Sequence, residues 1–150
     1  MTLRIFVDAD ACPVKEEVFK VALRTSTPVT LVANSYLRIP RHELFDLVVV
    51  EMDPDAADDH IAERAGENSI VITADIPLAD RCIKAGAAVI APNGKLFTES
   101  SIGSAMATRA LMQDLRAGGD IIGGPPPFER RDRSQFLQAL DRAIVQRARG

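Results

Sequence analysis

The sequence has little of several residue types, and each shortage argues against a class of protein. Only two of its 150 residues are cysteine, Cys12 and Cys82, which argues against a disulfide scaffold and suits a reducing cytoplasm. Only two are histidine, His42 and His60, and neither has a ligand spacing with cysteine, so a structural zinc site is not expected. No apolar run exceeds five residues, whereas a membrane-spanning helix needs about 20. We therefore expect a cytoplasmic protein with no membrane partner.

A signal-peptide pattern and an excess of basic residues are also missing. The first four residues lead directly into a strand-like run. The formal net charge is −3, which argues against a generally basic nucleic-acid-binding protein. Apolar residues make up 47% and charged residues 26% of the chain, the usual balance of a globular protein. We therefore expect one domain over residues 1–150.

Charge is distributed unevenly along the chain. Residues 51–80 hold nine acids and one base, whereas residues 109–150 hold eight arginines and five acids. Solvated helix faces explain part of this pattern. The arginine-rich residues 109–150 would otherwise contact a nucleic acid, or pair with the acidic residues 51–80 of a second copy in a homodimer.

Short apolar runs alternate with helical patterns. The pattern predicts strands at 3–7, 28–32, 47–50, 70–73 and 87–90. It predicts helices at 14–23, 56–65, 77–85, 102–117 and 136–147. The strand runs are continuously apolar, which is typical of parallel strands buried on both faces. We expect an α/β three-layer sandwich with a mainly parallel sheet of about five strands and no strand after Pro92, with the C-terminal helices from about residue 98 packed on it.

Acidic residues follow two of the predicted strands. Asp8 and Asp10 come after the first strand, two residues apart, so they point the same way in an extended chain. Asp75 follows the fourth strand, and Asp80 comes five residues later in the next helix. Ligands of parallel α/β sheets bind outside the carboxyl ends of the strands, near the point where the strand order reverses. We therefore expect these acids to lie at the binding edge of the sheet.

Asp58 is expected to approach the same edge from a helix. It shares a helical stripe with Ile61 and Ala65, which places it toward the packed side. A carboxylate there is costly without compensation, and several carboxylates within a few Å cannot all stay ionised without a countercharge. Hard oxygen ligands suit Mg²⁺ or Mn²⁺ better than zinc. The acids together therefore predict a divalent metal site.

Most of these acids also have a structural interpretation. Asp10 and Asp75 each stand just before a predicted helix and can cap it. Asp55 and Asp58 can form a capping pair at the start of the helix predicted at 56–65. Asp8 is the exception, because it precedes the capping position and ends an apolar strand.

Several segments resemble one known family. They are VDADACPVKEE, DDHIAERA, ITADIPLAD, TRALMQDLR, GGPPPF and DRSQFLQALD. These segments cover nearly the whole chain and resemble the YaiI/YqxD family of uncharacterised bacterial proteins, with VDADACP and GGPPPF the most specific. That family is similar to a branch of the PIN-like fold, which toxin ribonucleases and flap endonucleases share. We interpret the glycine- and proline-rich part of GGPPPF as a surface loop.

The resemblance implies a metal-dependent nuclease that acts on RNA or DNA. Asp8 matches the acid after the first strand of that fold, and Asp58 matches its mid-chain helix acid. Asp75 matches the acid after the fourth strand and Asp80 the last acid, while Asp10 is an additional acid typical of the family. One or two Mg²⁺ or Mn²⁺ ions would activate a water and stabilise the transition state. Asp8 and Asp75 would be inner ligands, with Asp58 and Asp80 bound directly or through water.

Other side chains are expected to contact the substrate or orient ligands. Thr73 and Asn34 would orient ligands from neighbouring strand ends, and Lys15 would meet a phosphate at a helix start. Arg109 and Arg116 lie seven residues apart on one helix face, so both would reach a nucleic-acid backbone unless they pair with surface acids.

Two other functions stay open. PIN-like folds can lose their metal and act as RNA-binding or interaction modules, although four intact acids favour catalysis. A haloacid-dehalogenase-type phosphatase also begins with an apolar strand and Asp-x-Asp, with Asp8 as nucleophile and Asp10 as acid. That mechanism needs a late acidic pair, whereas Asp58 and Asp59 precede Thr73 in this chain, which counts against it.

Overall fold

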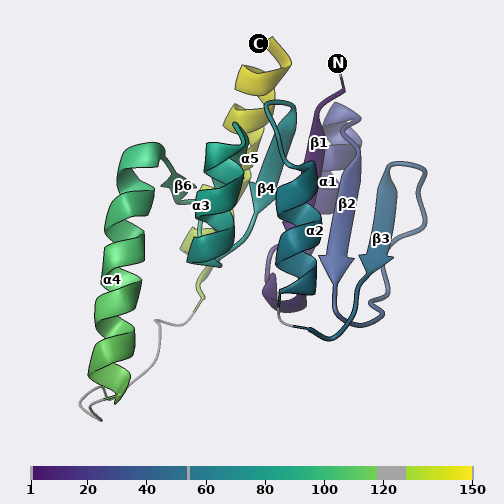
Figure 1. Ribbon diagram of the computed structural model, residues 1–150. Helices are drawn as coiled ribbons and strands as arrows, with labels where there is room; N and C mark the ends of the chain where they lie inside the picture. Colours follow the sequence, from purple (N-terminus) through teal and green to yellow (C-terminus); the bar gives the residue numbers. More distant parts are fainter. Residues whose placement is uncertain (1, 54, 118–127, 150) are drawn as a thin grey trace.

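The computed structural model describes residues 2–53, 55–117 and 128–149, with the side chains of residues 11, 113–117 and 149 outside that description. Strands alternate with helices through most of the chain (Figure 1). The strands are β1 (Arg4–Asp8), β2 (Val29–Ala33), β3 (Phe45–Val49), β4 (Ser69–Ile72), β5 (Ala88–Ile90) and β6 (Leu96–Phe97). The helices are η1 (Ala9–Ala11), α1 (Lys15–Thr25), α2 (Ala56–Arg64), α3 (Ile76–Lys84), α4 (Glu99–Ala117) and α5 (Arg130–Arg149).

The strands form one sheet in the order β3-β2-β1-β4-β5-β6. The first five are parallel, and β6 is antiparallel to β5. The chain moves outward from β1 to β2 and β3 on one side, then returns to place β4 and β5 on the other side. The strand order therefore reverses between β1 and β4, which makes their carboxyl ends the switch point of the sheet.

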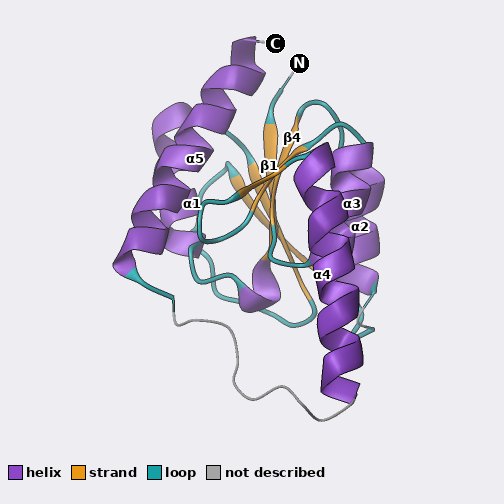
Figure 2. Cartoon of the chain, turned by 90° about the vertical axis from the view of Figure 1, so that its left-hand side faces the viewer, coloured by secondary structure: helices purple, strands orange, loops and turns teal. Residues whose placement is uncertain are grey.

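Helices cover both faces of the sheet. Figure 2 shows α1 and α5 on one side of the strands and α2, α3 and α4 on the other. Side chains of β1 alternate accordingly, with Ile5 and Val7 in the core under α1 and α5, and Phe6 in the core under α2 and α3. The predicted three-layer α/β sandwich is confirmed.

The turn between β5 and β6 packs closely on α5. Gly94 has a φ of +90°, a conformation that glycine adopts without strain. A Cβ atom at this position would lie 2.6 Å from the carbonyl carbon of Gln135 and 2.8 Å from the backbone nitrogen of Phe136. Only a residue without a side chain allows this approach of the turn to the helix.

Some expected boundaries are wrong. A strand, β6, follows Pro92 after all; its two residues, Leu96 and Phe97, are too few to show a period. α5 begins at Arg130 rather than at 136, because its first turn is polar and has no apolar stripe. The loop expected at Gly123–Pro127 lies outside the described residues. Within the described ranges, no helix is both long enough and apolar enough to cross a membrane.

Candidate active site

The carboxyl ends of β1 and β4 lie next to each other in the sheet. β1 ends at Asp8, and the register pairs Val7 with Ile72, the last residue of β4. Thr73 follows β4 directly and is 2% exposed. The switch point therefore brings together residues 65 positions apart in the chain, as the apolar strand pattern predicts.

Thr73 connects two of the predicted acids. The backbone N–H of Asp75 donates to Thr73 Oγ1 over 3.0 Å. Because that N–H can only donate, the hydroxyl of Thr73 directs its own hydrogen to Asp8 Oδ2, 2.9 Å away. Thr73 thus orients Asp8 and anchors the backbone that carries Asp75.

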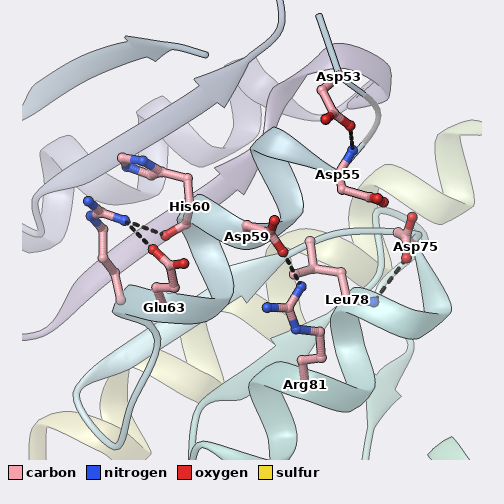
Figure 3. Close-up of polar contacts among 9 residues, drawn as sticks. Asp53, Asp55, Asp59, His60, Glu63, Asp75, Leu78 and Arg81 are labelled. Carbon is pink, nitrogen blue, oxygen red and sulfur yellow. Dashed lines mark hydrogen bonds and ion pairs between the residues drawn. The ribbon is translucent and has the colours of Figure 1, made fainter. Parts of the chain in front are cut away.

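Asp75 is also the N-cap of α3. Its Oδ1 accepts a hydrogen bond from the backbone N–H of Leu78 over 2.9 Å, as Figure 3 shows. The capping interpretation is confirmed, and it leaves the second carboxylate oxygen of Asp75 without a hydrogen bond to the described residues. Asp75 can therefore stabilise the helix and still face a ligand.

Asp58 shares the electrostatic environment of Asp8 and Asp75. It lies half-buried in the first turn of α2. Burial, followed by the negative charges of Asp75, Asp8 and Asp55, raises its pKa from 3.8 to about 6. Three carboxylates from β1, α2 and the β4–α3 connection therefore repel one another at one edge of the sheet.

Asp8 is affected in the same way. Burial raises its pKa, the hydrogen bond from Thr73 lowers it, and the charges of Asp75 and Asp10 raise it further. The net direction is upward, so the ionised form of Asp8 is disfavoured in the absence of a nearby positive charge.

The neighbouring acids on the helices have cationic partners instead. Asp59 pairs with Arg81 of α3 at 2.8 Å, and Figure 3 shows this carboxylate turned toward the guanidinium. Asp80, which was expected among the catalytic acids, pairs with Lys84 at 2.8 Å on the same helix. Its charge is not among those that raise the pKa of Asp58 or Asp8. The role of Asp80 in a metal site stays a prediction.

Asp10 joins two loops at the same edge. Both of its carboxylate oxygens accept from the backbone N–H of Asn34, over 3.1 and 3.0 Å. It does not cap α1, whose N-cap is Val14, so that interpretation is wrong. The 3₁₀ turn η1 carries Asp10 away from the helix start and toward the end of β2. This contact does not favour the general-acid role that a phosphatase mechanism would require of Asp10.

Asn34 extends this connection to the segment before α2. Its side-chain Nδ2 donates to the backbone oxygen of Glu51 over 2.8 Å and to that of Asp53 over 3.4 Å. Asn34 thus fixes the loops after β2 and β3 relative to η1, which is a positioning role. Asn34 was predicted to orient ligands, but no hydrogen bond joins it to Asp8, Asp58 or Asp75 among the described residues.

Asp55 contributes a negative charge near Asp58, whereas its sequence position predicted only a capping role. Its side chain makes no capping hydrogen bond. Instead, its own backbone N–H donates to Asp53 Oδ1 over 2.9 Å (Figure 3). Its charge raises the pKa of Asp58, after burial and the charges of Asp75 and Asp8. The many acids at residues 51–59 were the sequence signal for a negative charge near Asp58. Periodicity alone did not show which of these acids lie near the sheet edge.

The predicted basic residues are placed differently from one another. Lys15 opens α1, and its Nζ donates to the backbone oxygen of Ala9 over 3.2 Å, which leaves two further donors. Arg109 is exposed on α4. Arg116 lies on the same helix, but its side chain is outside the described residues.

Within residues 2–53, 55–117 and 128–149, no three aspartate, glutamate, histidine or cysteine side chains are placed so that they could hold one metal ion. The donor chemistry still fits a hard cation. Magnesium is usually bound through one or two carboxylates with several waters retained, rather than by a cage of protein ligands. A site of that kind requires fewer direct contacts than three.

Comparison with other proteins gives a family but no activity. A model of the uncharacterised YaiI/YqxD family matches residues 6–146. A UPF0178 protein of Sphingopyxis alaskensis is 63% identical over 147 residues, which cover 97% of this chain and 96% of the relative. A UPF0178 protein of Nitrobacter winogradskyi is 61% identical over 142 residues, covering 95% and 90%. No solved structure matches the chain. This match covers nearly the whole chain and confirms the resemblance predicted from the VDADACP and GGPPPF segments. The chain therefore belongs to the YaiI/YqxD family.

Proposed function

We propose that this protein is a Mg²⁺- or Mn²⁺-dependent nuclease that hydrolyses phosphodiester bonds of RNA or DNA. One observation carries the proposal: Thr73 joins Asp8 to the backbone of Asp75 at the switch point of the sheet, and burial and the charges of these two acids raise the pKa of neighbouring Asp58. Carboxylates from three elements that repel one another at a switch point are destabilising on their own. A divalent cation would convert this repulsion into attraction.

Asp8 and Asp75 are the residues that would bind such an ion directly. One oxygen of Asp8 accepts from Thr73 and one oxygen of Asp75 accepts from Leu78. The other oxygen of each carboxylate makes no hydrogen bond within the described parts of the chain. Asp58, and Asp80 if its ion pair with Lys84 opens, would then contribute through bound water.

The chain's own residues supply orientation and proton transfer. A bound ion would provide a Lewis acid for the phosphoryl oxygen and would lower the pKa of a water. Thr73 holds Asp8 in a fixed orientation through its hydroxyl. Asp58 would accept the proton of the attacking water, because it lies beside Asp8 and Asp75 and would bind the ion only through water. Lys15 would donate to a substrate phosphate with the hydrogens that Ala9 does not use.

Cleavage of labelled oligonucleotides tests the proposal. Single-stranded and structured RNA and DNA are incubated with the protein and Mn²⁺, Mg²⁺ or EDTA. We expect cleavage with a divalent ion and none in EDTA. Asp8→Asn keeps the shape of the side chain but removes its charge, and should lower the cleavage rate by about 100-fold or more.

Asp59→Asn is the matched control. It removes the same charge one residue from Asp58, but from a carboxylate that pairs with Arg81. We expect it to cleave at nearly the wild-type rate. Equal cleavage by wild-type protein and Asp8→Asn would contradict the site assignment.

A catalytically inactive RNA-binding or interaction module is the second candidate. The contacts of Asp10 with Asn34 and of Asp80 with Lys84 favour it, because they engage two of the predicted ligands in protein interactions. Binding of nucleic acid without cleavage, under every divalent ion tested, would select this function over the nuclease.

A further inference from the structure

The connection between β2 and β3 presents a basic and aromatic surface. Residues 34–44 leave the carboxyl end of β2 and run along the β3 edge of the sheet to the start of β3 (Figure 1). Tyr36 is 77% exposed, and Arg38, Arg41 and His42 are exposed as well. We call these four residues, with the hollow beside them, the β2–β3 surface.

This surface is held in place by apolar residues that alternate with the exposed ones. Leu37 and Ile39 are partly buried and pack against the core under α1 and α5, whereas Tyr36 and Arg38 point outward. Such alternation is typical of an extended chain lying on an apolar layer. The exposed side chains are therefore displayed on an anchored segment.

The hollow is large and its charges are not neutralised. Tyr36, Ile39, Pro40 and Phe45 line it together with the basic residues, and its volume is about 950 Å³. Neither Arg38 nor Arg41 has an ion pair or side-chain hydrogen bond among the described residues, although Glu43 is close in sequence. His42 is held locally, because its Nδ1 accepts from the backbone N–H of Leu44 over 3.1 Å. Two free guanidinium groups beside an exposed phenol ring suit a ligand with both phosphates and flat bases.

We infer that the β2–β3 surface binds single-stranded nucleic acid, with a base stacked on Tyr36 and backbone phosphates on Arg38 and Arg41. Aromatic rings stack on bases of any sequence, and arginine pairs with phosphate through two parallel hydrogen bonds. A protein with an overall charge of −3 needs a local patch of this kind to approach a polyanion. This inference rests on the proposed nuclease function and names the form of its substrate.

The connection that carries the β2–β3 surface begins next to the acidic site. Asn34 is two residues from Tyr36, and its backbone N–H is held by Asp10 beside Asp8. The start of the connection is therefore fixed relative to the carboxyl end of β1. A nucleic-acid strand bound along the β2–β3 surface would continue toward Asp8 and Asp75.

Fluorescence anisotropy with a labelled 12-nucleotide oligo-uridine and the matching oligo-thymidine, in EDTA, tests the inference without cleavage. The double variant Arg38→Ala/Arg41→Ala should bind at least about tenfold more weakly than wild type. The slope of log K against log salt concentration should decrease by about 1.4, the value for two phosphate contacts on a single strand. Tyr36→Ala should lose about fivefold or more, and Tyr36→Phe should retain binding because the ring is kept.

The double variant Lys20→Ala/Lys95→Ala removes the same charge from exposed positions on α1 and in the β5–β6 turn, outside the β2–β3 surface and the arginine-rich C-terminal segment. It should bind within about twofold of wild type. Equal loss in both double variants, or no loss in Arg38→Ala/Arg41→Ala with an unchanged circular dichroism spectrum, would overturn the inference. Self-association that Arg38→Ala/Arg41→Ala abolishes, in the absence of oligonucleotide binding, would instead assign the surface to a second copy and also overturn it.

Binding and cleavage assays can contradict the β2–β3 surface and the nuclease function independently of each other. Asp8→Asn should bind the oligonucleotide in EDTA as well as wild type, because Asp8 is not part of the β2–β3 surface. Binding without cleavage would contradict the nuclease and leave this surface standing. Mn²⁺-dependent cleavage at the wild-type rate and KM by Arg38→Ala/Arg41→Ala would contradict the surface and leave the nuclease standing.

Discussion

The turn after β5 and the aspartates after β1 and β4 lie at the same edge of the sheet and are both crowded, but by different atoms. At Gly94, backbone atoms of α5 occupy the space where a side chain would begin. At Asp8 and Asp58, burial and the negative charge of nearby Asp75 raise the pKa values of both carboxyl groups. Close packing of neutral atoms stabilises the fold without help, whereas crowded like charges require a positive partner. The comparison separates a region that stabilises the fold from the region where we propose that a cation binds.

Gly94→Ala is expected to have the largest effect on stability. The new Cβ would meet Gln135 backbone atoms at 2.6 and 2.7 Å, and its φ of +90° is unfavourable for alanine. The turn and α5 must move apart, which should lower the free energy of unfolding by about 2–4 kcal/mol. Urea denaturation followed by circular dichroism measures this change.

Gly103→Ala is the matched control for Gly94→Ala. A Cβ at Gly103 would have no neighbour within 4 Å, and the residue lies in α4. Alanine favours a helix over glycine by up to about 1 kcal/mol, so the free energy of unfolding should stay the same or rise slightly. Similar losses in both variants would contradict the close approach at Gly94.

Asp58→Asn is expected to stabilise the protein in EDTA at neutral pH. The pKa of Asp58 is about 6 in the folded protein and 3.8 in the unfolded chain, so the folded state binds its proton more tightly. Stability from this group is therefore complete below pH 4 and is lost as the pH rises through 6. A shift of this size corresponds to about 3 kcal/mol, which solvent screening of a partly exposed carboxylate reduces to about 1 kcal/mol.

Denaturation of both proteins at pH 4 and pH 7.5 provides the test. The variant should be more stable than wild type at pH 7.5, and this difference should be much smaller at pH 4. A variant less stable than wild type at pH 7.5 would show that Asp58 makes favourable contacts and does not lie among uncompensated charges.

Asp59→Asn is expected to have the smallest effect. Its ion pair with Arg81 is exposed, with 52% of the Asp59 side chain and 45% of the Arg81 side chain accessible. Such pairs contribute about 0.2–1 kcal/mol, so the free energy of unfolding should fall by no more than about 1 kcal/mol. If Asp59→Asn instead stabilised the protein at pH 7.5, Asp59 would lie among uncompensated charges as Asp58 does, which would contradict the proposed difference between them.

Much of the fold could be predicted because its strands are continuously apolar. Continuously apolar runs such as residues 70–73 indicate buried parallel strands without any tertiary information. Parallel strands, in turn, place their carboxyl ends at the same edge of the sheet. The helical stripe through Asp58 and Ile61 likewise placed Asp58 toward the sheet edge, where burial and nearby negative charges raise its pKa. These features depend on the periodicity of apolar residues and on the order of strands and helices along the chain, both of which the sequence contains.

The remaining features depend on distances between segments that are far apart in the chain. The bond from Thr73 to Asp8 depends on the register of β4 on β1. The link between Asp10 and Asn34 depends on the turn η1, which a capping pattern at Asp10 had concealed. β6 is two residues long and is held by pairing with β5, so its own pattern carried no signal.

Calorimetric titration with Mn²⁺ at pH 7.5 tests the central claim most directly. If Asp8, Asp58 and Asp75 form a site that a divalent cation stabilises, wild-type protein should bind Mn²⁺. Asp8→Asn should then bind it at least about tenfold more weakly, while Asp59→Asn binds as wild type does. Equal affinity of wild type and Asp8→Asn for Mn²⁺, or no binding by wild type, would contradict it.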